Sequence, residues 1–146
     1  MRKGYESMKT VFKVGMCMLA AVAMTGCASM GGGGMSDEEM IQELIIEAMA
    51  ALVAQDIEAM TAAYADDFES DQGGGVAETR EFLQGAKEQG FLDGIVVDTE
   101  PMEIVGEGEE ATAGPIDLEG AFGSLSLEFE LEKRDGEWLV TYQSQY

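Results

Sequence analysis

Apolar residues between positions 41 and 52 recur at the spacing of one face of an α-helix. They are Ile41, Leu44, Ile45, Ala48, Met49 and Leu52, and acidic side chains fall on the opposite side. Just before them, Ser36 and Glu39 have the spacing of a capping box, in which both side chains bond backbone N–H groups at a helix start. The pattern therefore predicts a helix of about four to five turns that ends near Ala54.

A second, shorter helix is predicted directly afterwards. Asp56 is placed to cap it, and Ile57, Met60 and Tyr64 are expected on its buried side. Residues 66–70 fit a short strand. A third helix is predicted from position 76 to about position 89, because three glycines precede it and a glycine at position 90 ends it.

The third helix is amphipathic. Its apolar residues Phe82, Leu83 and Ala86 are expected to face inward.

The pattern changes beyond Gly94, where apolar and polar residues alternate with the period of a β-strand. One strand is predicted to open at residues 95–97. A second is predicted at residues 109–119, with Pro115 on an edge or at a bulge. The last two strands flank Asp135-Gly136, which is a strong signal for a two-residue hairpin turn.

The sequence also predicts a register for this last hairpin. A turn at residues 135–136 pairs Leu131 with Val140 and Phe129 with Tyr142. One face is then apolar, with Leu125, Leu127, Phe129 and Leu131 on one strand and Trp138, Val140, Tyr142 and Tyr146 on the other. The other face pairs Glu128 and Glu130 with Gln143 and Thr141.

The beginning of the chain has the pattern of an export signal. Lys9 and Lys13 precede an apolar stretch, residues 14–24, that is too short for a stop-transfer helix. The stretch ends in Met-Thr-Gly-Cys, and this resembles the lipobox of bacterial lipoproteins, in which the cysteine is lipidated. We therefore expect residues 1–26 to be a lipoprotein signal peptide and Cys27 to carry the lipid. A plain signal peptide with an incidental cysteine is the alternative.

A lipid on Cys27 would anchor the mature protein to a membrane, because two or more acyl chains such as palmitate give stable binding. Residues 27–35 form a Gly-rich tether, and residues 36–146 form the domain. The residues after the cysteine resemble the outer-membrane-sorted class of lipoprotein. The expected location is the cell envelope, and in a cell with two membranes the outer one. Cys17 lies inside the signal, so no disulfide is expected within the mature chain.

The charge of the chain excludes some classes of function. The 146 residues carry 29 acidic and 8 basic side chains, a formal net charge of −21. Loss of residues 1–26 removes four basic residues and one acidic residue, so the net charge becomes −24. Such a field repels nucleic acids and anionic headgroups, so no nucleic-acid partner is expected. The chain has no histidine, and neither a metal nor a cofactor is expected.

Four segments together resemble nuclear transport factor 2 and its ketosteroid isomerase-like and SnoaL-like relatives. They are residues 50–56 (AALVAQD), 64–68 (YADDF), 80–83 (REFL) and 135–138 (DGEW). The resemblance implies an α+β domain in which three N-terminal helices pack on a curved antiparallel sheet, a cystatin-like cone that encloses a cavity. In the isomerase relatives, a catalytic tyrosine stands at the position that Ala48 occupies in this sequence, and the catalytic base falls near Asp71 or Gln72. The resemblance therefore implies that this chain departs from the catalytic pattern of the isomerases.

The residues expected to contact a ligand in the cone are Tyr64, Phe82, Phe129 and Tyr142. Methionines are expected to fill the core, and a cavity lined by them would accept varied apolar ligands. No catalytic residue is assigned. A second possibility is a calcium loop, because Asp67, Glu69, Asp71 and Glu78 have the spacing of its ligands. Gln72 stands where that loop needs a glycine, which favours a solvated acidic loop.

The function expected from these features is a membrane-anchored, non-catalytic module that binds a small apolar ligand or a protein partner. The alternative is a small isomerase, dehydratase or cyclase that uses Asp66, Asp71 or Asp117 with a tyrosine as oxyanion donor. That alternative requires a carboxyl group inside the cavity. A homodimer formed through the sheet is a further possibility.

Overall fold

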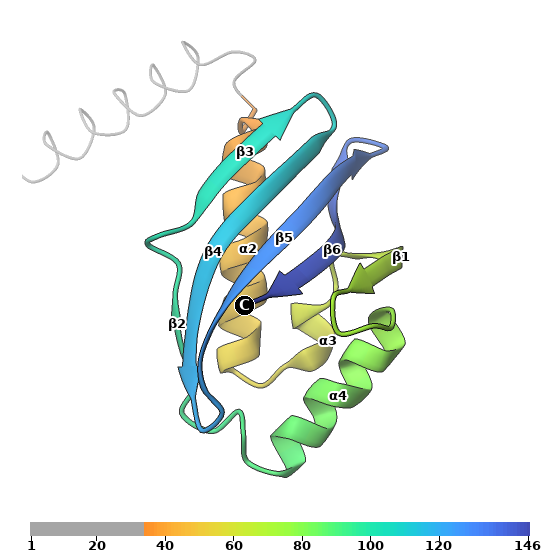
Figure 1. The fold of residues 1–146 in the computed structure, drawn as a ribbon. Helices are drawn as coiled ribbons and strands as arrows, with labels where there is room; N and C mark the ends of the chain where they lie inside the picture. Colours follow the sequence, from red (N-terminus) through yellow and green to blue (C-terminus); the bar gives the residue numbers. More distant parts are fainter. Residues whose placement is uncertain (1–33) are drawn as a thin grey trace, which may run out of the picture. The chain divides into compact units, whose positions relative to one another are not determined.

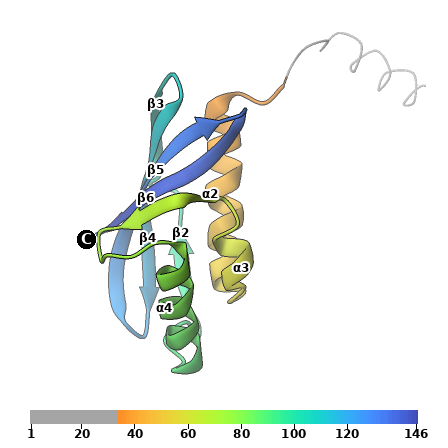
Figure 2. The same cartoon turned by 90° about the vertical axis from the view of Figure 1, so that its right-hand side faces the viewer.

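The computed structural model describes residues 34–146, so the predicted signal peptide and the lipidation of Cys27 lie outside the described residues. The elements are α2 (Asp37–Val53), α3 (Ile57–Met60), β1 (Tyr64–Ser70), α4 (Val76–Glu88), β2 (Val96–Asp98), β3 (Glu103–Glu107), β4 (Glu110–Gly120), β5 (Gly123–Arg134) and β6 (Glu137–Gln145). Figure 1 shows α2 crossing one face of a curved sheet. All three helices lie on that side, as Figure 2 shows.

The first two helices begin at the caps that the sequence predicts. The backbone N–H of Glu39 donates to Ser36 Oγ at 3.2 Å, and the N–H of Ser36 donates to Glu39 Oε2 at 2.8 Å. The predicted capping box is therefore confirmed. Asp56 accepts a hydrogen bond from the N–H of Ala59 and caps α3. The predicted ends of α2 and α4 agree with the structure to within one residue.

The sheet is mixed, with the strand order β1-β6-β5-β4-β2 and with β3 paired to β4 beside β2. The α+β prediction is confirmed, but one strand departs from the antiparallel arrangement: β1 runs parallel to β6. It satisfies backbone groups on the edge of β6, where the N–H of Val140 donates to the carbonyl of Ala63 at 2.8 Å. Pro115 lies where the register of β4 shifts, so the predicted bulge is also confirmed.

The turn of the last hairpin is as predicted, but the register beyond it is not. Asp135 and Gly136 both have positive φ, 53° and 84°, as a two-residue hairpin turn of this kind requires. Leu131 pairs with Val140 as expected, but the next pair along the strands is Glu130 with Tyr142. A bulge on β6 inserts Thr141 as an extra residue, and every side chain beyond it changes face.

The predicted pairing of Phe129 with Tyr142 is therefore wrong. Phe129 pairs with Gln143, and Glu128 pairs with Ser144. Tyr142 lies on the outer face beside Glu130, and Tyr146 is 69% exposed.

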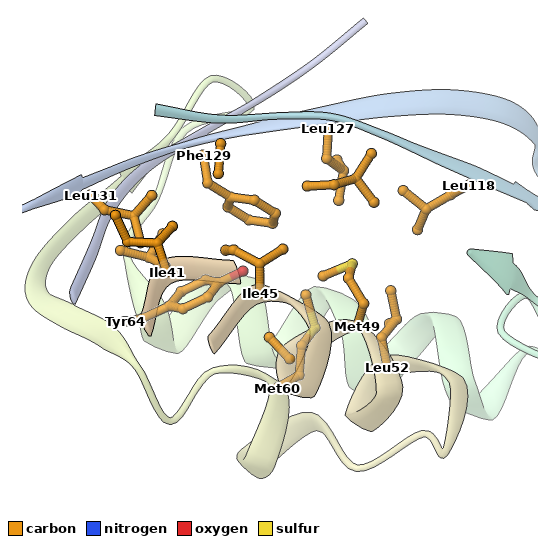
Figure 3. Packing of buried hydrophobic residues seen from close by; sticks show 14 of the residues in the cluster. Ile41, Ile45, Met49, Leu52, Met60, Tyr64, Leu118, Leu127, Phe129 and Leu131 are labelled. Atoms are coloured by element: carbon orange, nitrogen blue, oxygen red, sulfur yellow. The ribbon is translucent and has the colours of Figure 1, made fainter. Parts of the chain in front are cut away.

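The core lies between α2 and the sheet. Figure 3 shows Ile41, Ile45, Met49 and Leu52 of α2 facing the sheet. Their partners from the strands include Leu118, Leu127, Phe129 and Leu131, and every one of these eight side chains is at most 4% exposed. Because burial of each such side chain contributes about 1.5–3 kcal/mol, this layer fixes α2 on the sheet. Helix α4 differs from α2, since no residue of α4 is buried.

Candidate functional site

A groove of about 790 Å³ lies between α4 and the helix-bearing face of the sheet. Its floor consists of buried apolar side chains, each at most 6% exposed. These are Leu52, Met60, Leu92, Ile95, Leu118 and Leu127. The groove is in the size range of small-molecule sites, which are concave and mostly apolar.

Three phenylalanines form the rim of the groove. Phe82 on α4, Phe91 after it and Phe122 in the β4–β5 turn all line the groove and are exposed. Phe82 faces the groove but is 73% exposed, so the expectation that it packs into the core is wrong. The reason is that α4 spans an open groove instead of closing on a filled core. Leu83 and Ala86 of the same helix are half-buried and line the groove as well.

Polar groups line the groove from two sides, β6 and the α4 segment, where Thr79 and Gln89 contribute beside two glutamates. Gln143 and Gln145 both line the groove, and both are half-buried. The hydroxyl of Tyr64, at the start of β1, donates to Gln143 Oε1 at 2.9 Å. Burial raises the pKa of Tyr64, so its hydroxyl stays protonated at neutral pH and has a proton to donate.

Sequence reasoning missed both glutamines because of the bulge at Thr141. Without the bulge, Tyr142 would face the groove and Gln143 would face outward. The segment Tyr142–Tyr146 alternates aromatic or serine residues with glutamines, so either set could face a wet cavity. No signal in the sequence decides between them.

The charged residues at the groove are acidic. Glu78 and Glu81 lie at its α4 side and are exposed, and no basic side chain is among the described residues that line it. The two basic residues of α4 form contacts elsewhere. Arg80 Nε donates to Thr61 Oγ1 at 2.7 Å, and Lys87 Nζ donates to the carbonyl of Gln55 at 2.9 Å.

The four residues predicted to contact a ligand have different positions. Phe82 lines the groove. Tyr64 and Phe129 are buried in the core beside it and are not part of the lining, although Tyr64 contacts it through Gln143. Tyr142 lies beyond the bulge on the outer face, next to Glu130.

The acids considered for catalysis do not gather in the groove. Asp66, Asp71 and Asp117 are all exposed, and none of them lines it. Asp71 instead accepts a hydrogen bond from the N–H of Gln145 at 2.8 Å, and Asp117 accepts one from Ser126. The expectation of the enzyme alternative, that one of these carboxyl groups lies inside the cavity, is wrong.

The carboxylates with calcium-loop spacing also point to separate partners. Asp67 binds the guanidinium of Arg134 through both oxygens, at 2.7 and 3.0 Å. Glu78 accepts the N–H of Gly75 at 3.0 Å and caps α4. Within residues 34–146, no three acidic or cysteine side chains converge as metal ligands. In the same part of the chain, no helix is long and apolar enough to cross a membrane.

Comparison with known proteins gives no match by sequence but several by structure. No protein-family model matches the sequence, and no curated protein matches it. A protein of unknown function with a cystatin-like fold from Nostoc punctiforme PCC 73102 is 20% identical, with a TM-score of 0.62. The match covers 77% of this chain and 93% of that one.

Two further solved structures are similar to this chain to about the same degree. An NTF2-like protein of unknown function from Pseudomonas putida KT2440 is 22% identical over 77% of this chain and 88% of that one, with a TM-score of 0.63. A ketosteroid isomerase-like protein from Erwinia carotovora atroseptica is 20% identical over 75% of this chain and 95% of that one, with a TM-score of 0.59. The described domain therefore has the cystatin-like, NTF2-like cone fold that the sequence resemblance implied.

Proposed function

We propose that this protein is a lipid-anchored, non-catalytic module of the cell envelope that binds a small, apolar, uncharged or cationic molecule in the groove beside α4. The observation that carries the proposal is a largely apolar groove of about 790 Å³ with the amides of Gln143 and Gln145 on its β6 wall and no described basic residue in its lining. A buried apolar surface of this kind supplies affinity, and a few polar groups supply orientation.

Charge limits the class of ligand. Glu78 and Glu81 stand at the groove, and the domain as a whole is strongly acidic. An anionic ligand such as a fatty acid would lose its hydration and meet only negative side chains. A neutral or cationic amphiphile meets no such penalty.

The tether of the proposed anchor would leave the groove accessible. The domain begins at Ser36, next to the first residue of α2, whereas Leu52 near the other end of that helix lines the groove. A rise of 1.5 Å per residue separates the two positions by about 24 Å. A lipid on Cys27 would thus hold the domain by the end that lies far from its groove. Replacement of Cys27 by serine tests the anchor, because it should move the protein from the membrane fraction to the soluble fraction.

The alternative of a small enzyme keeps some support from the names of structural neighbours, such as a ketosteroid isomerase-like protein and a putative scytalone dehydratase. In this chain, however, the carboxylates at the groove are exposed residues of α4. A general acid or base of the expected kind needs a desolvated carboxyl group near the reacting atoms. Binding without turnover is therefore the function that the geometry supports best.

Fluorescence titration with N-phenylnaphthylamine, a neutral apolar probe, tests the proposal. The informative variant is Ala86→Trp, because Ala86 lines the groove and a helix without buried residues tolerates a large side chain there. The matched control is Gln84→Trp, since Gln84 is exposed on the same helix and lies outside the lining. We expect the Ala86 variant to lose about tenfold or more in affinity and the control to bind normally.

Equal affinity in both variants would contradict binding in the groove. If the unmodified protein binds no probe of this class, the proposal fails. The exposed rim of Phe82, Phe91 and Phe122 would then remain as a surface for a protein partner.

A further inference from the structure

We infer that the groove recognises an apolar molecule that carries a carbonyl-type acceptor, and that the side-chain amide of Gln143 donates the hydrogen bond that selects it. This inference rests on the proposed function and names the class of ligand for the same groove. It assigns Gln143 as the specificity-determining residue and Tyr64 as the residue that positions it.

The direction of the bond between Tyr64 and Gln143 determines which end of the amide is left for a ligand. The tyrosine hydroxyl is 2.9 Å from the amide oxygen and is the donor. With the amide reversed, the hydroxyl would accept instead, and its own proton would lack an acceptor in a buried position. The amide oxygen is thus occupied, and the NH₂ group of Gln143 remains as the donor.

The backbone around Gln143 is held in place as well. The carbonyl of Gln143 accepts from the N–H of Asp71 at 3.0 Å. Two residues on, the N–H of Gln145 donates to the carboxylate of Asp71 at 2.8 Å. Gln143 also pairs with Phe129 on the neighbouring strand. A polar group that is fixed through both its backbone and its side chain loses little entropy when it binds, and this is the property of a built recognition site.

The rest of the lining specifies the remainder of the ligand. The floor is apolar, so the ligand needs an apolar body. The only charges among the described lining residues are carboxylates, so a carboxylate, sulfonate or phosphate is a poor acceptor for this donor. A neutral carbonyl oxygen meets both conditions. The other amide on the β6 wall, of Gln145, receives no hydrogen bond from a described side chain and can rotate to donate or to accept, whereas the amide of Gln89 on the α4 side donates to the carbonyl of Gly85.

The test compares two neutral probes with the full-length protein. Prodan is a dimethylaminonaphthalene with one ketone, and its emission moves to the red when that ketone accepts a hydrogen bond. N-phenylnaphthylamine has a similar apolar body and no carbonyl. We expect Gln143→Leu to weaken Prodan binding about five- to tenfold and to shift its bound emission to the blue. The same variant should bind N-phenylnaphthylamine as well as the unmodified protein does.

Gln145→Leu is the matched control, because it removes an amide from the same wall that no tyrosine holds. It should change the ratio of the two affinities by less than about twofold. An equal change of that ratio in both variants would overturn the assignment to Gln143. If neither probe binds the unmodified protein, the proposed function fails and this inference falls with it. If both probes bind and Gln143→Leu leaves their ratio unchanged, only this inference fails.

The role of Tyr64 is tested by a double-mutant cycle. Tyr64→Phe removes only the hydroxyl that orients the amide, so it should weaken Prodan binding in the unmodified background and not in the Gln143→Leu background. A purely structural role of the hydroxyl would weaken both probes in both backgrounds, and that result would overturn the positioning role. A further variant, Gln143→Glu, keeps the size of the side chain and replaces the donor with an acceptor. Prodan affinity should then be low at neutral pH and recover as the introduced carboxyl group becomes protonated.

Discussion

At the scale of single residues, Arg134 joins the end of β5 to β1. Its guanidinium binds both carboxylate oxygens of Asp67 in β1, and it also contacts Glu132 on its own strand at 2.7 Å. The hydrogen bonds from Arg134 lower the pKa of Asp67 below its ordinary value. A two-bond pair of this geometry is stronger than a single surface contact, although solvent reaches it.

This pKa shift predicts how Asp67→Asn changes the dependence of stability on pH. A carboxyl group with a lowered folded-state pKa contributes stability above its unfolded pKa and loses that contribution as the pH falls through the folded value. The variant should therefore melt at a lower temperature than the unmodified protein at pH 7, and the two melting temperatures should converge below about pH 4. Thermal unfolding followed by circular dichroism across this range measures the effect.

Asp66→Asn is the control for Asp67→Asn. It removes the same charge one residue away, from an exposed side chain without an ion pair among the described residues. Because the domain is strongly acidic, this change should leave stability unaltered or raise it. A similar loss of stability in both variants at pH 7 would contradict the role of the Arg134 pair.

The hairpin also shows what the sequence could and could not predict at this scale. The caps at Ser36 and Asp56 and the turn at Asp135-Gly136 were predictable, since each depends on interactions within a few residues. The groove glutamines were not. One extra residue, Thr141, reverses the face of all residues after it. The bulge accompanies the pairing of β6 with β1, a contact between segments that are far apart in the sequence.

At the scale of elements, α2 and α4 differ in how they are held. Five residues of α2 are buried against the sheet, whereas α4 buries none and packs mainly against β1 and α3. The amphipathic pattern of α4 predicted an inward face, and that face does point to the sheet side. It meets an open groove instead of a filled core. Periodicity indicates which side of a helix is apolar, but it does not indicate whether other side chains fill the space beyond it.

We predict from this difference that α4 is less protected than α2 in amide hydrogen exchange. An isolated helix of 13 residues is marginal in water, and few buried contacts add to the stability of α4. Its amides should exchange at least about tenfold faster than the central amides of α2. Saturation with N-phenylnaphthylamine should slow exchange in α4 and leave α2 nearly unchanged, because the probe would bridge α4 and the sheet. Mass spectrometry of peptides from the two helices measures both rates.

Two outcomes would contradict this prediction. Equal protection of α2 and α4 without a probe would mean that the open groove does not weaken α4. Slower exchange in α2 alone on probe binding would place the probe elsewhere in the domain.

The strands were predictable where their own residues alternate clearly, and one was missed where only its pairing with another strand defines it. The long strands β4, β5 and β6 were predicted near their observed bounds, since alternation over nine or more residues is a strong signal. The short strand β3 was missed. Its residues Glu103–Glu107 include a glycine and two glutamates, and all but Ile104 are exposed. Such an edge strand is defined by its pairing with β4 and not by its own composition.

At the scale of the whole molecule, repulsion among acidic side chains opposes folding. The described residues include only four basic side chains, and two of them, Lys133 and Arg134, form the ion pairs. Across the sheet, the register aligns Glu107 of β3, Glu110 of β4 and Glu132 of β5 in one row. Like charges directly opposite one another destabilise a sheet. Of these three glutamates, only Glu132 has its charge offset by Arg134. The same acidic strands would face a second copy in the homodimer through the sheet, which stays a prediction.

This row of glutamates predicts that salt stabilises the domain. A rise in NaCl from about 10 mM to about 1 M shortens the screening length from about 30 Å to about 3 Å, so the melting temperature should increase by several degrees. Glu110→Gln should raise the melting temperature at low salt by roughly 1–3 °C and reduce the gain from added salt. Glu43→Gln removes the same charge from an exposed position on α2 and should do less.

The choice of cation separates screening from specific binding. Screening depends on ionic strength, so Ca²⁺ and Mg²⁺ at equal millimolar concentrations should raise the melting temperature equally. Asp67, Asp71 and Glu78 already accept hydrogen bonds from three different partners, and a calcium ion would have to displace these contacts. A rise with Ca²⁺ that Mg²⁺ does not reproduce would show that the acidic loop rearranges into a cation site. In that case the stability of the domain would depend on this site as well as on screening.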